Sequence, residues 1–189
     1  MTDNTSTITI HMVASVDGFI AKADGDISWM QSGDHYPNGI ELTEADIKAF
    51  LDRIDCYVMG SKTYEHALEL GWPYGDVPVK VLTSRELITD KKTVEFYSGD
   101  IRHFVHHVLK PHYSNIWMVG GAAVAKEFIR LELADEMVIS IMPVILGDGL
   151  LFFDYVGTER RLHLKDVKAY KDGMVELIYE IKKKATIYG

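Results

Sequence analysis

Residues 55–65 read DCYVMGSKTYE, a short apolar run that ends at Gly60 and continues into polar residues. The run Asp55–Met59 predicts a buried strand, because it is short, apolar and closed by a turn residue. Gly60 and Ser61 then turn the chain into a helix that carries Tyr64. A strand followed at once by a helix is the repeating unit of α/β proteins. This stretch therefore predicts a sheet with helices packed on it.

The same alternation extends through the rest of the chain. A helix is expected to begin after Thr43, because Asp46 stands in the capping-box position. Before it, the segment Val16–Gly39 is expected to be a long loop. Further strands are predicted at Thr7–Ser15, Val79–Thr83, Val94–Tyr97, Asn115–Val119 and Glu136–Val144, with helices after Asp100 and over Ala122–Leu131. Leu162–Tyr170 and Met174–Lys182 are expected to pair as a hairpin across an Asp-Gly turn. The prediction is a single α/β domain over residues 1–189 with a mostly parallel central sheet and an antiparallel C-terminal hairpin.

Composition limits the function. The chain has 189 residues, 47% hydrophobic, with 20 basic and 28 acidic side chains and a net charge of −8. Excess negative charge argues against binding to nucleic acid or to an anionic membrane. Cys56 is the single cysteine, so no intrachain disulfide can form. The N-terminus lacks the features of a signal peptide, and the apolar run Met137–Leu146 is too short to span a bilayer. A cytoplasmic protein is expected.

Three predicted strands end in residues suited to an anion. Ligands of open α/β sheets bind beyond the carboxyl ends of the strands. Glycine turns, hydroxyl groups, cations and helix N-termini are found there, in Gly60–Thr63, Thr83–Arg85 and Gly120–Val124. Each segment alone is weak evidence for a ligand, because a helix cap or a tight turn accounts for it. Together, at one edge of one sheet, they favour a ligand rich in phosphate.

The chain resembles the dihydrofolate reductase-like family. It is most similar to the reductase domain of riboflavin biosynthesis (the RibD C-terminal domain) and its uncharacterised bacterial relatives. Met59–Glu65 is similar to the M-G-R-x-T-W-E segment of dihydrofolate reductases. The other matching segments, in the order of the family, are Ala14-Ser15-Val16-Asp17-Gly18, Trp29, Val119-Gly120-Gly121, Ala134-Asp135-Glu136 and Pro143–Gly147. The resemblance covers Ile8 to about Ile181.

The resemblance implies a three-layer sandwich, NADPH as the hydride donor and a homodimer. It also implies a cis peptide between Gly120 and Gly121 and a lid, Val16–Met30, that closes over the nicotinamide. The implied cofactor-binding residues are Ala14, Gly18, Trp29, Gly60, Ser61, Lys62, Thr63, Thr83, Ser84, Arg85, Gly120, Gly121, Ala122, Ala123 and Val124. Ser61 replaces the usual arginine of the family, so Lys62 and Arg85 would supply the positive charge.

On the substrate side the resemblance implies contacts from Asp17 and Val119. Val119 stands where the riboflavin reductases have a substrate-binding glutamate. Asp34 follows Trp29 at the offset of the catalytic carboxylate of dihydrofolate reductases, where a buried carboxylate would assist protonation. The expected activity is the NADPH-dependent reduction of a small pteridine- or pyrimidine-type heterocycle. It would be similar to that of 5-amino-6-(5-phosphoribosylamino)uracil reductase or of dihydrofolate reductase.

Two other functions are compatible with the sequence. One is a non-catalytic module of the same fold that binds a nucleotide or a pterin, and the other is a flavin-binding protein. No metal site is expected, because His103, His106 and His107 share a helix face with no carboxylate placed to complete a ligand set.

Overall fold

Strand β1 (Thr7–Ser15) is the centre of the protein in the computed structural model, which describes residues 6–183. Its residues alternate, so that Ile8, Ile10 and Met12 are buried on one face of the sheet. Both of its edges are paired, with β6 (Asn115–Gly120) on one side and β7 (Glu136–Met142) on the other, each parallel to β1. On the opposite face Thr7, Thr9 and His11 are half-buried, so the strand alternates polar and apolar side chains.

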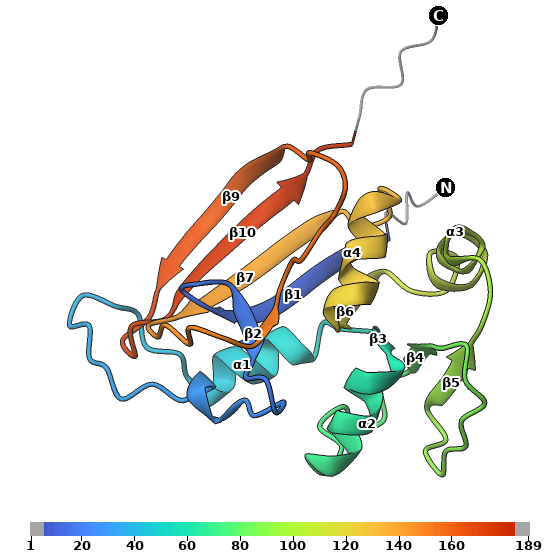
Figure 1. The fold of residues 1–189 in the computed structure, drawn as a ribbon, viewed down its shortest axis with the longest axis horizontal. Helices are drawn as coiled ribbons and strands as arrows, with labels where there is room; N and C mark the ends of the chain where they lie inside the picture. The colour runs from blue at the N-terminus through green and yellow to red at the C-terminus, as the bar shows by residue number, and fades with distance from the viewer. Residues whose placement is uncertain (1–5, 184–189) are drawn as a thin grey trace, which may run out of the picture.

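Eight strands form the main sheet in the order β5-β4-β3-β6-β1-β7-β10-β9 (Figure 1). The strands from β5 to β7 are parallel, whereas β10 is antiparallel to both β7 and β9. The bounds are β3 (Cys56–Gly60), β4 (Val79–Leu82), β5 (Val94–Tyr97), β9 (Leu162–Ala169) and β10 (Val175–Ile181). A second, two-stranded sheet pairs β2 (Phe19–Ala21) with β8 (Leu150–Leu151).

Helices lie on both faces of the main sheet. One face carries α3 (Ile101–His103), which continues into the π-helical turn η2 (Phe104–Leu109), and α4 (Ala122–Arg130). The other face carries α1 (Glu44–Leu51) and α2 (Ser61–Glu69). Two cores result. The larger contains Phe104 and Phe128, and the smaller contains Met59 and Tyr64. The expected three-layer α/β sandwich is confirmed.

The sequence missed two features of this fold. The short strands β2 and β8 were not predicted, because strands of three and two residues carry no periodic signal. Strand β7 also ends at Met142, two residues earlier than expected, because Pro143 follows it and has no N–H group to donate to a neighbouring strand. Within residues 6–183, the helices are all too short or too polar to cross a membrane.

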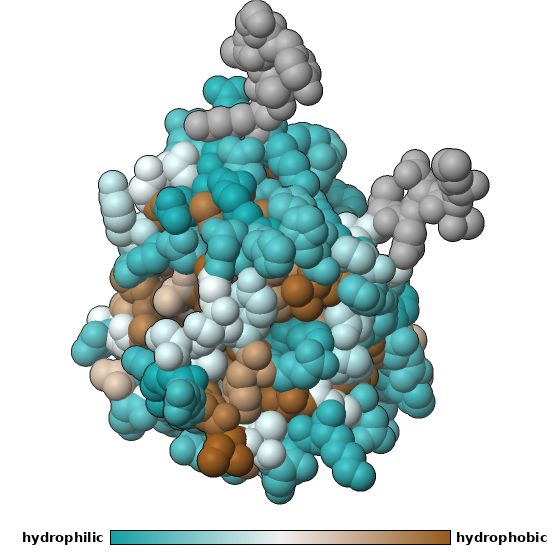
Figure 2. Space-filling view, turned by 90° about the vertical axis from the view of Figure 1, so that its right-hand side faces the viewer, coloured by the Kyte–Doolittle hydropathy of each residue, from teal (hydrophilic) through white to brown (hydrophobic). Residues whose placement is uncertain are grey.

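The end of the molecule that carries α3 and β5 is largely hydrophilic. Figure 2 shows this end, where hydrophobic side chains form small, separate groups among polar ones. Isolated apolar side chains of this kind are normal on the surface of a monomer.

Ile10 and Ile88 allow a matched test of the larger core. Ile10 is fully buried and Ile88 is 98% exposed. Ile10→Ala should lower the free energy of unfolding by about 2–5 kcal/mol, because it leaves a cavity. Ile88→Ala should lower it by less than about 0.5 kcal/mol. Urea denaturation measures both values, and equal losses would contradict the place of Ile10 in the core.

Candidate functional site

Two strand–helix turns meet where β3 lies beside β6. Helix α2 leaves the sheet at Gly60 and α4 leaves it at Gly121, and the two helices lie on opposite faces. A Cβ atom added to Gly60 would lie 3.0 Å from Val124 Cγ2, and one added to Gly121 would lie 3.4 Å from Thr63 Oγ1. The turns are therefore in contact, and glycine makes the approach possible. The Gly120–Gly121 peptide is cis, as expected.

Both helices begin with unsatisfied backbone donors. The N-cap residues are Gly60 and Gly121, and among residues 6–183 no side chain caps either helix. The first N–H groups of a helix have no partner within the helix, and the helix dipole makes this end positive. Two such ends beside each other form a surface that attracts an anion.

The third strand end lies next to this pair, because β4 is the neighbour of β3. Thr83 Oγ1 accepts the backbone N–H of Arg85 at 3.0 Å. The Arg85 guanidinium donates to Glu65 Oε1 of α2 at 2.8 Å, and both side chains are about half exposed. Lys62 is exposed and has no ion-pair partner in the described part of the chain. The three sequence-predicted segments thus come together at one edge of the sheet.

The segment after β1 is joined to a distant loop by Asp17. Its carboxylate accepts the hydroxyl of Ser15 at 2.6 Å and the backbone N–H groups of Leu146 and Gly147 at 3.1 and 2.7 Å. These donors lower the pKa of Asp17 to about 2. The backbone of Gly18 adds a further link, since its carbonyl accepts the N–H of Phe152 at 2.8 Å. In the structure Asp17 positions two loops, and a contact with substrate stays a prediction.

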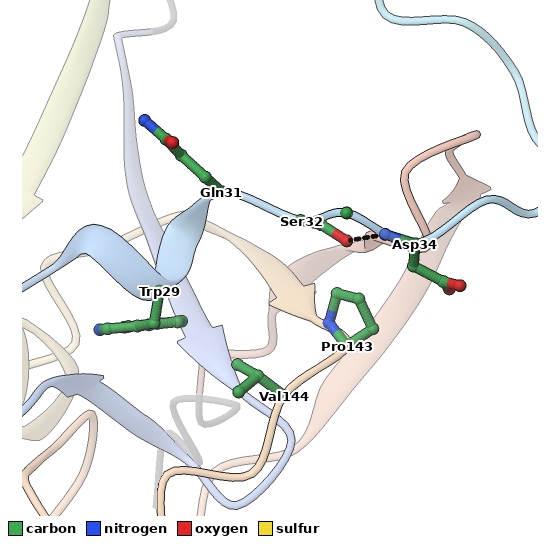
Figure 3. A pocket seen from close by; sticks show the side chains of 7 residues that line it. Trp29, Gln31, Ser32, Asp34, Pro143 and Val144 are labelled. Carbon is green, nitrogen blue, oxygen red and sulfur yellow. Dashed lines mark hydrogen bonds between the residues drawn. The ribbon is translucent and has the colours of Figure 1, made fainter.

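A cavity of about 280 Å³ lies between the segment that begins at Trp29 and the start of the loop after β7 (Figure 3). Its lining consists of Trp29, Gln31, Ser32, Gly33, Asp34, Pro143 and Val144. Trp29 is buried, and its indole Nε1 has no hydrogen-bond partner among the residues that the structure describes. A buried N–H group without a partner is uncommon, and Figure 3 shows this nitrogen on the side of the ring away from Asp34 and Pro143. Trp29 therefore fits the expected place in the wall of a binding site.

Asp34 lies at the rim of this cavity. Figure 3 shows its carboxylate pointing away from Trp29, and a Cβ added to Gly173 would meet Asp34 Oδ2 at 2.4 Å. The side chain thus packs against the β9–β10 turn and is exposed to solvent. The proton-relay role implied by the resemblance needs a buried carboxylate, which the structure does not provide. Asp34 belongs to the segment Gly33–Gly39, which is a loop in the structure.

Val119 is the extra residue of a β-bulge. Val58 pairs with Met118 and Met59 with Gly120, so Val119 has no opposite partner in β3. Its side chain is partly buried against the smaller core. The position therefore offers an apolar contact at the end of β6.

The family model of the RibD C-terminal domain matches residues 6–176. The chain belongs to this family. Two proteins of Bacillus subtilis (strain 168) are similar over most of their length, and both are named as uncharacterised. YwjB is 31% identical over 163 residues, which is 85% of this chain and 90% of that protein. YyaP is 27% identical over 187 residues, which is 91% and 93% of the two chains.

Solved structures share the fold of this RibD C-terminal domain. A protein of Shewanella sp. PV-4, named as a candidate riboflavin biosynthesis protein, aligns with a TM-score of 0.80 and 23% identity over 94% of this chain and 99% of its own. The deaminase/5-amino-6-(5-phosphoribosylamino)uracil reductase of Thermotoga maritima aligns with a TM-score of 0.69 and 15% identity over 96% of this chain and 58% of its own. A pyrimidine reductase-like protein of Corynebacterium diphtheriae has a TM-score of 0.66 and 13% identity over 95% and 93%. The RibD-like reductase fold is thereby established.

Sequence reasoning missed a polar pair inside this RibD C-terminal domain. His11 of β1 lies against Trp117, with ring centroids 5.0 Å apart, and its Nε2 is 3.3 Å from the hydroxyl of buried Ser140. Its Nδ1 is buried and has no partner in the described residues. Burial lowers the pKa of His11 to about 4, so the ring is neutral at pH 7. The sequence did carry one signal for this pair, which is the presence of a histidine within the alternating strand Thr7–Ser15.

Stability should depend on His11 in a defined pH range. The unfolded chain binds a proton on this ring near pH 6.5, and the folded chain binds it only near pH 4. Stability therefore falls as the pH drops from about 6.5 to about 4, by up to about 3 kcal/mol. His11→Phe keeps an aromatic ring beside Trp117 and should make the free energy of unfolding less dependent on pH between about 6.5 and 4, as measured by urea denaturation. His106→Phe, at an exposed position, is the control. An equal loss of pH dependence in that variant would contradict the interpretation.

Asp17→Asn should loosen the two loops that the carboxylate joins. An amide oxygen cannot replace two carboxylate oxygens, and the amide nitrogen cannot accept a backbone N–H. Hydrogen exchange of Leu146 and Gly147 should become at least several-fold faster. Asp148→Asn is the matched control, because Asp148 lies in the same loop and, within residues 6–183, its carboxylate accepts only the N–H of its neighbour Gly149. Unchanged exchange in Asp17→Asn would show that other contacts hold the loops together.

Proposed function

We propose that this RibD C-terminal domain is an NADPH-dependent reductase of a small pteridine- or pyrimidine-type heterocycle. The observation that carries the proposal is the contact between the Gly60 and Gly121 turns, which brings two uncapped helix N-termini together at the ligand-binding edge of the sheet. Membership of the family supports the reductase class. The name of the Thermotoga maritima neighbour supports a ribosylated pyrimidine as one possible substrate.

The residues at the turns fit a dinucleotide. The glycines let the two turns pack against each other, so the backbone N–H groups at the starts of both helices lie close together, an arrangement that suits a pyrophosphate. Gly60–Thr63 and Gly120–Val124 would hold the pyrophosphate. Lys62 and Thr83–Arg85 would hold the phosphate on the adenosine ribose. When bound, NADPH supplies the hydride that reduces the substrate.

Arg85 has capacity for such a phosphate although it is already paired. A guanidinium carries five N–H donors, and Glu65 uses only part of them. The Glu65 carboxylate holds the guanidinium over the first turns of α2 and, being negative, weakens the pull of Arg85 on an anion. Selectivity for NADPH over NADH would thus depend on Arg85 and Lys62 together.

The substrate would lie beside Trp29, in the cavity that Pro143 and Val144 line at the start of the loop held by Asp17. Closure of the loops over the substrate would exclude water from the reacting atoms, which a hydride transfer requires. A flat heterocycle could pack against the Trp29 ring and the side chains of Pro143 and Val144, which line this cavity.

Arg85→Ala and Arg130→Ala test the cofactor site as a matched pair. Both arginines are ion-paired to a glutamate, at 2.8 and 2.7 Å, and their side chains are 50% and 52% exposed. Arg85→Ala should weaken NADPH binding about 10-fold or more, since a charge-assisted contact contributes about 1.5–3 kcal/mol. Lys62→Ala should do the same, and Arg130→Ala should have no effect. Quenching of tryptophan fluorescence by NADPH measures the affinity; unchanged affinity in Arg85→Ala and Lys62→Ala would refute the assignment.

Oxidation of NADPH tests the activity itself. The loss of NADPH absorbance is followed with dihydrofolate and with the pyrimidine substrate of the riboflavin reductase. Turnover of either supports the proposal. If NADPH binds but none of the heterocycles is reduced, the non-catalytic binding module is favoured. The apolar Val119 and the exposed Asp34 are consistent with that alternative. A visible absorption spectrum of the purified protein with flavin bands would favour the flavin-binding alternative.

A further inference from the structure

A carboxylate stands beside the two cations that the proposed function assigns to a phosphate. Glu65 belongs to α2, and its Oε1 accepts the Arg85 guanidinium at 2.8 Å. Lys62 precedes Glu65 by three residues in the same helix, so the two side chains share a helix face. A negative group so close to both cations weakens their attraction for a phosphate. The position of Glu65 is therefore unexpected for a site that takes NADPH alone.

The ion pair between Glu65 and Arg85 contributes little to the stability of the fold. The two side chains are 43% and 50% exposed, and exposed ion pairs are weak because water and salt screen them. Opening such a pair costs less than about 5-fold in an equilibrium constant. Either partner is thus released readily to a ligand that binds it more strongly.

Both partners keep unused capacity for hydrogen bonds. Within residues 6–183, Arg85 donates to Glu65 through Nη2, and its Nε and Nη1 have no acceptor. Over the same residues, the second oxygen of the Glu65 carboxylate, Oε2, accepts no hydrogen bond. The segment is held in place by Thr83, whose Oγ1 accepts the backbone N–H of Arg85 at 3.0 Å. A donor group and an acceptor group therefore lie side by side at the end of β4.

Glu65 is ionised at neutral pH. The hydrogen bond from Arg85 lowers the pKa of Glu65, and the charges of Arg85 and Lys62 lower it further. An ionised carboxylate can only accept hydrogen bonds. It therefore suits a hydroxyl group and repels a phosphate, whereas the guanidinium of Arg85 binds a phosphate.

The two forms of the nicotinamide cofactor differ in the same two ways. The 2′-oxygen of the adenosine ribose is a hydroxyl group in NADH and carries a phosphate in NADPH. In other dinucleotide-binding folds a carboxylate accepts the hydroxyl, and an arginine binds the phosphate. Glu65 and Arg85 place one group of each kind at the strand end where the proposed function puts the adenosine.

We propose that Glu65 and Arg85 form a site for either form of the cofactor, so that this domain binds NADH as well as NADPH. The inference rests on the proposed function, because it concerns the same cofactor site. In the NADPH complex Arg85 leaves Glu65 and binds the phosphate. In the NADH complex Arg85 stays paired, and the free oxygen of Glu65 accepts the ribose hydroxyl. Glu65 is thus the residue that limits the preference for NADPH.

Glu65→Gln tests the proposal in isothermal titrations of the full chain with NADPH and with NADH. Loss of the charge should tighten NADPH binding about 3-fold, because Arg85 is freed, and weaken NADH binding about 3-fold, because a neutral acceptor is weaker. The preference, which is the ratio of the two dissociation constants, should therefore rise about 10-fold. Glu127→Gln is the matched control, since Glu127 pairs with Arg130 at 2.7 Å and is 34% exposed. It should change the preference less than about 2-fold.

Two adenosine fragments examine the same position without the nicotinamide. Glu65→Gln should tighten the binding of adenosine 2′,5′-bisphosphate and weaken that of adenosine 5′-monophosphate. Arg85→Ala should have the opposite selectivity, with a loss of about 10-fold or more for the bisphosphate and less than about 3-fold for the monophosphate. Circular dichroism shows whether each variant is folded, and Glu65→Ala, with the same expected direction, replaces Glu65→Gln if that variant does not fold.

The outcomes separate this inference from the proposed function. Wild-type affinities for NADH and NADPH within about 10-fold of each other, together with the increase in preference in Glu65→Gln, support the inference. A wild type that binds NADPH alone, or a preference that Glu65→Gln leaves unchanged or alters no more than Glu127→Gln does, overturns the inference and leaves the proposed function intact. A wild type that binds neither dinucleotide refutes the proposed cofactor, and the inference with it.

Discussion

The contact between two strand–helix turns sets the geometry on which the rest of the structure depends. Gly60 and Gly121 approach so closely that a side chain on either would meet Val124 or Thr63. This packing places α2 and α4 on opposite faces of the sheet while their first turns lie side by side. The same packing brings together the strand ends that carry the proposed cofactor site. A side chain at Gly60 would require Val124 to shift.

Much of the fold could be predicted because its signals are local. The alternation in Thr7–Ser15 and the Thr43–Asp46 capping box depend on neighbours in the sequence, and both are present in the structure. The chemistry of the three strand ends was also visible, because parallel strands bring their carboxyl ends to one edge of a sheet. Two features could not be predicted: the π-helical geometry of η2 and the pairing of β2 with β8. Neither leaves a periodic pattern in the sequence.

The parts of the site that escaped prediction depend on distant residues. The carboxylate of Asp17 bonds the backbone at Leu146 and Gly147, and nothing near Asp17 in the sequence specifies that loop. The pair of His11 and Ser140 likewise needs the registry between β1 and β7. Asp34 is the opposite case, because the sequence suggested an environment that the structure does not have. Its spacing from Trp29 suggested a buried carboxylate, and the conformation of the intervening loop, which spacing does not encode, leaves it exposed.

The central place of β1 has a consequence for the order of folding. Ile8 pairs with Ile116 and Ile10 with Met137, so the first strand of the chain has no partner until β6 and β7 exist. Contacts this far apart in sequence slow folding, because a large loop must close before they form. During synthesis on the ribosome, an apolar β1 would wait unpaired while more than half of the chain is made. A chaperone that shields this strand should therefore increase the yield of folded protein more than one that acts on the C-terminal hairpin, whose two strands are neighbours in sequence.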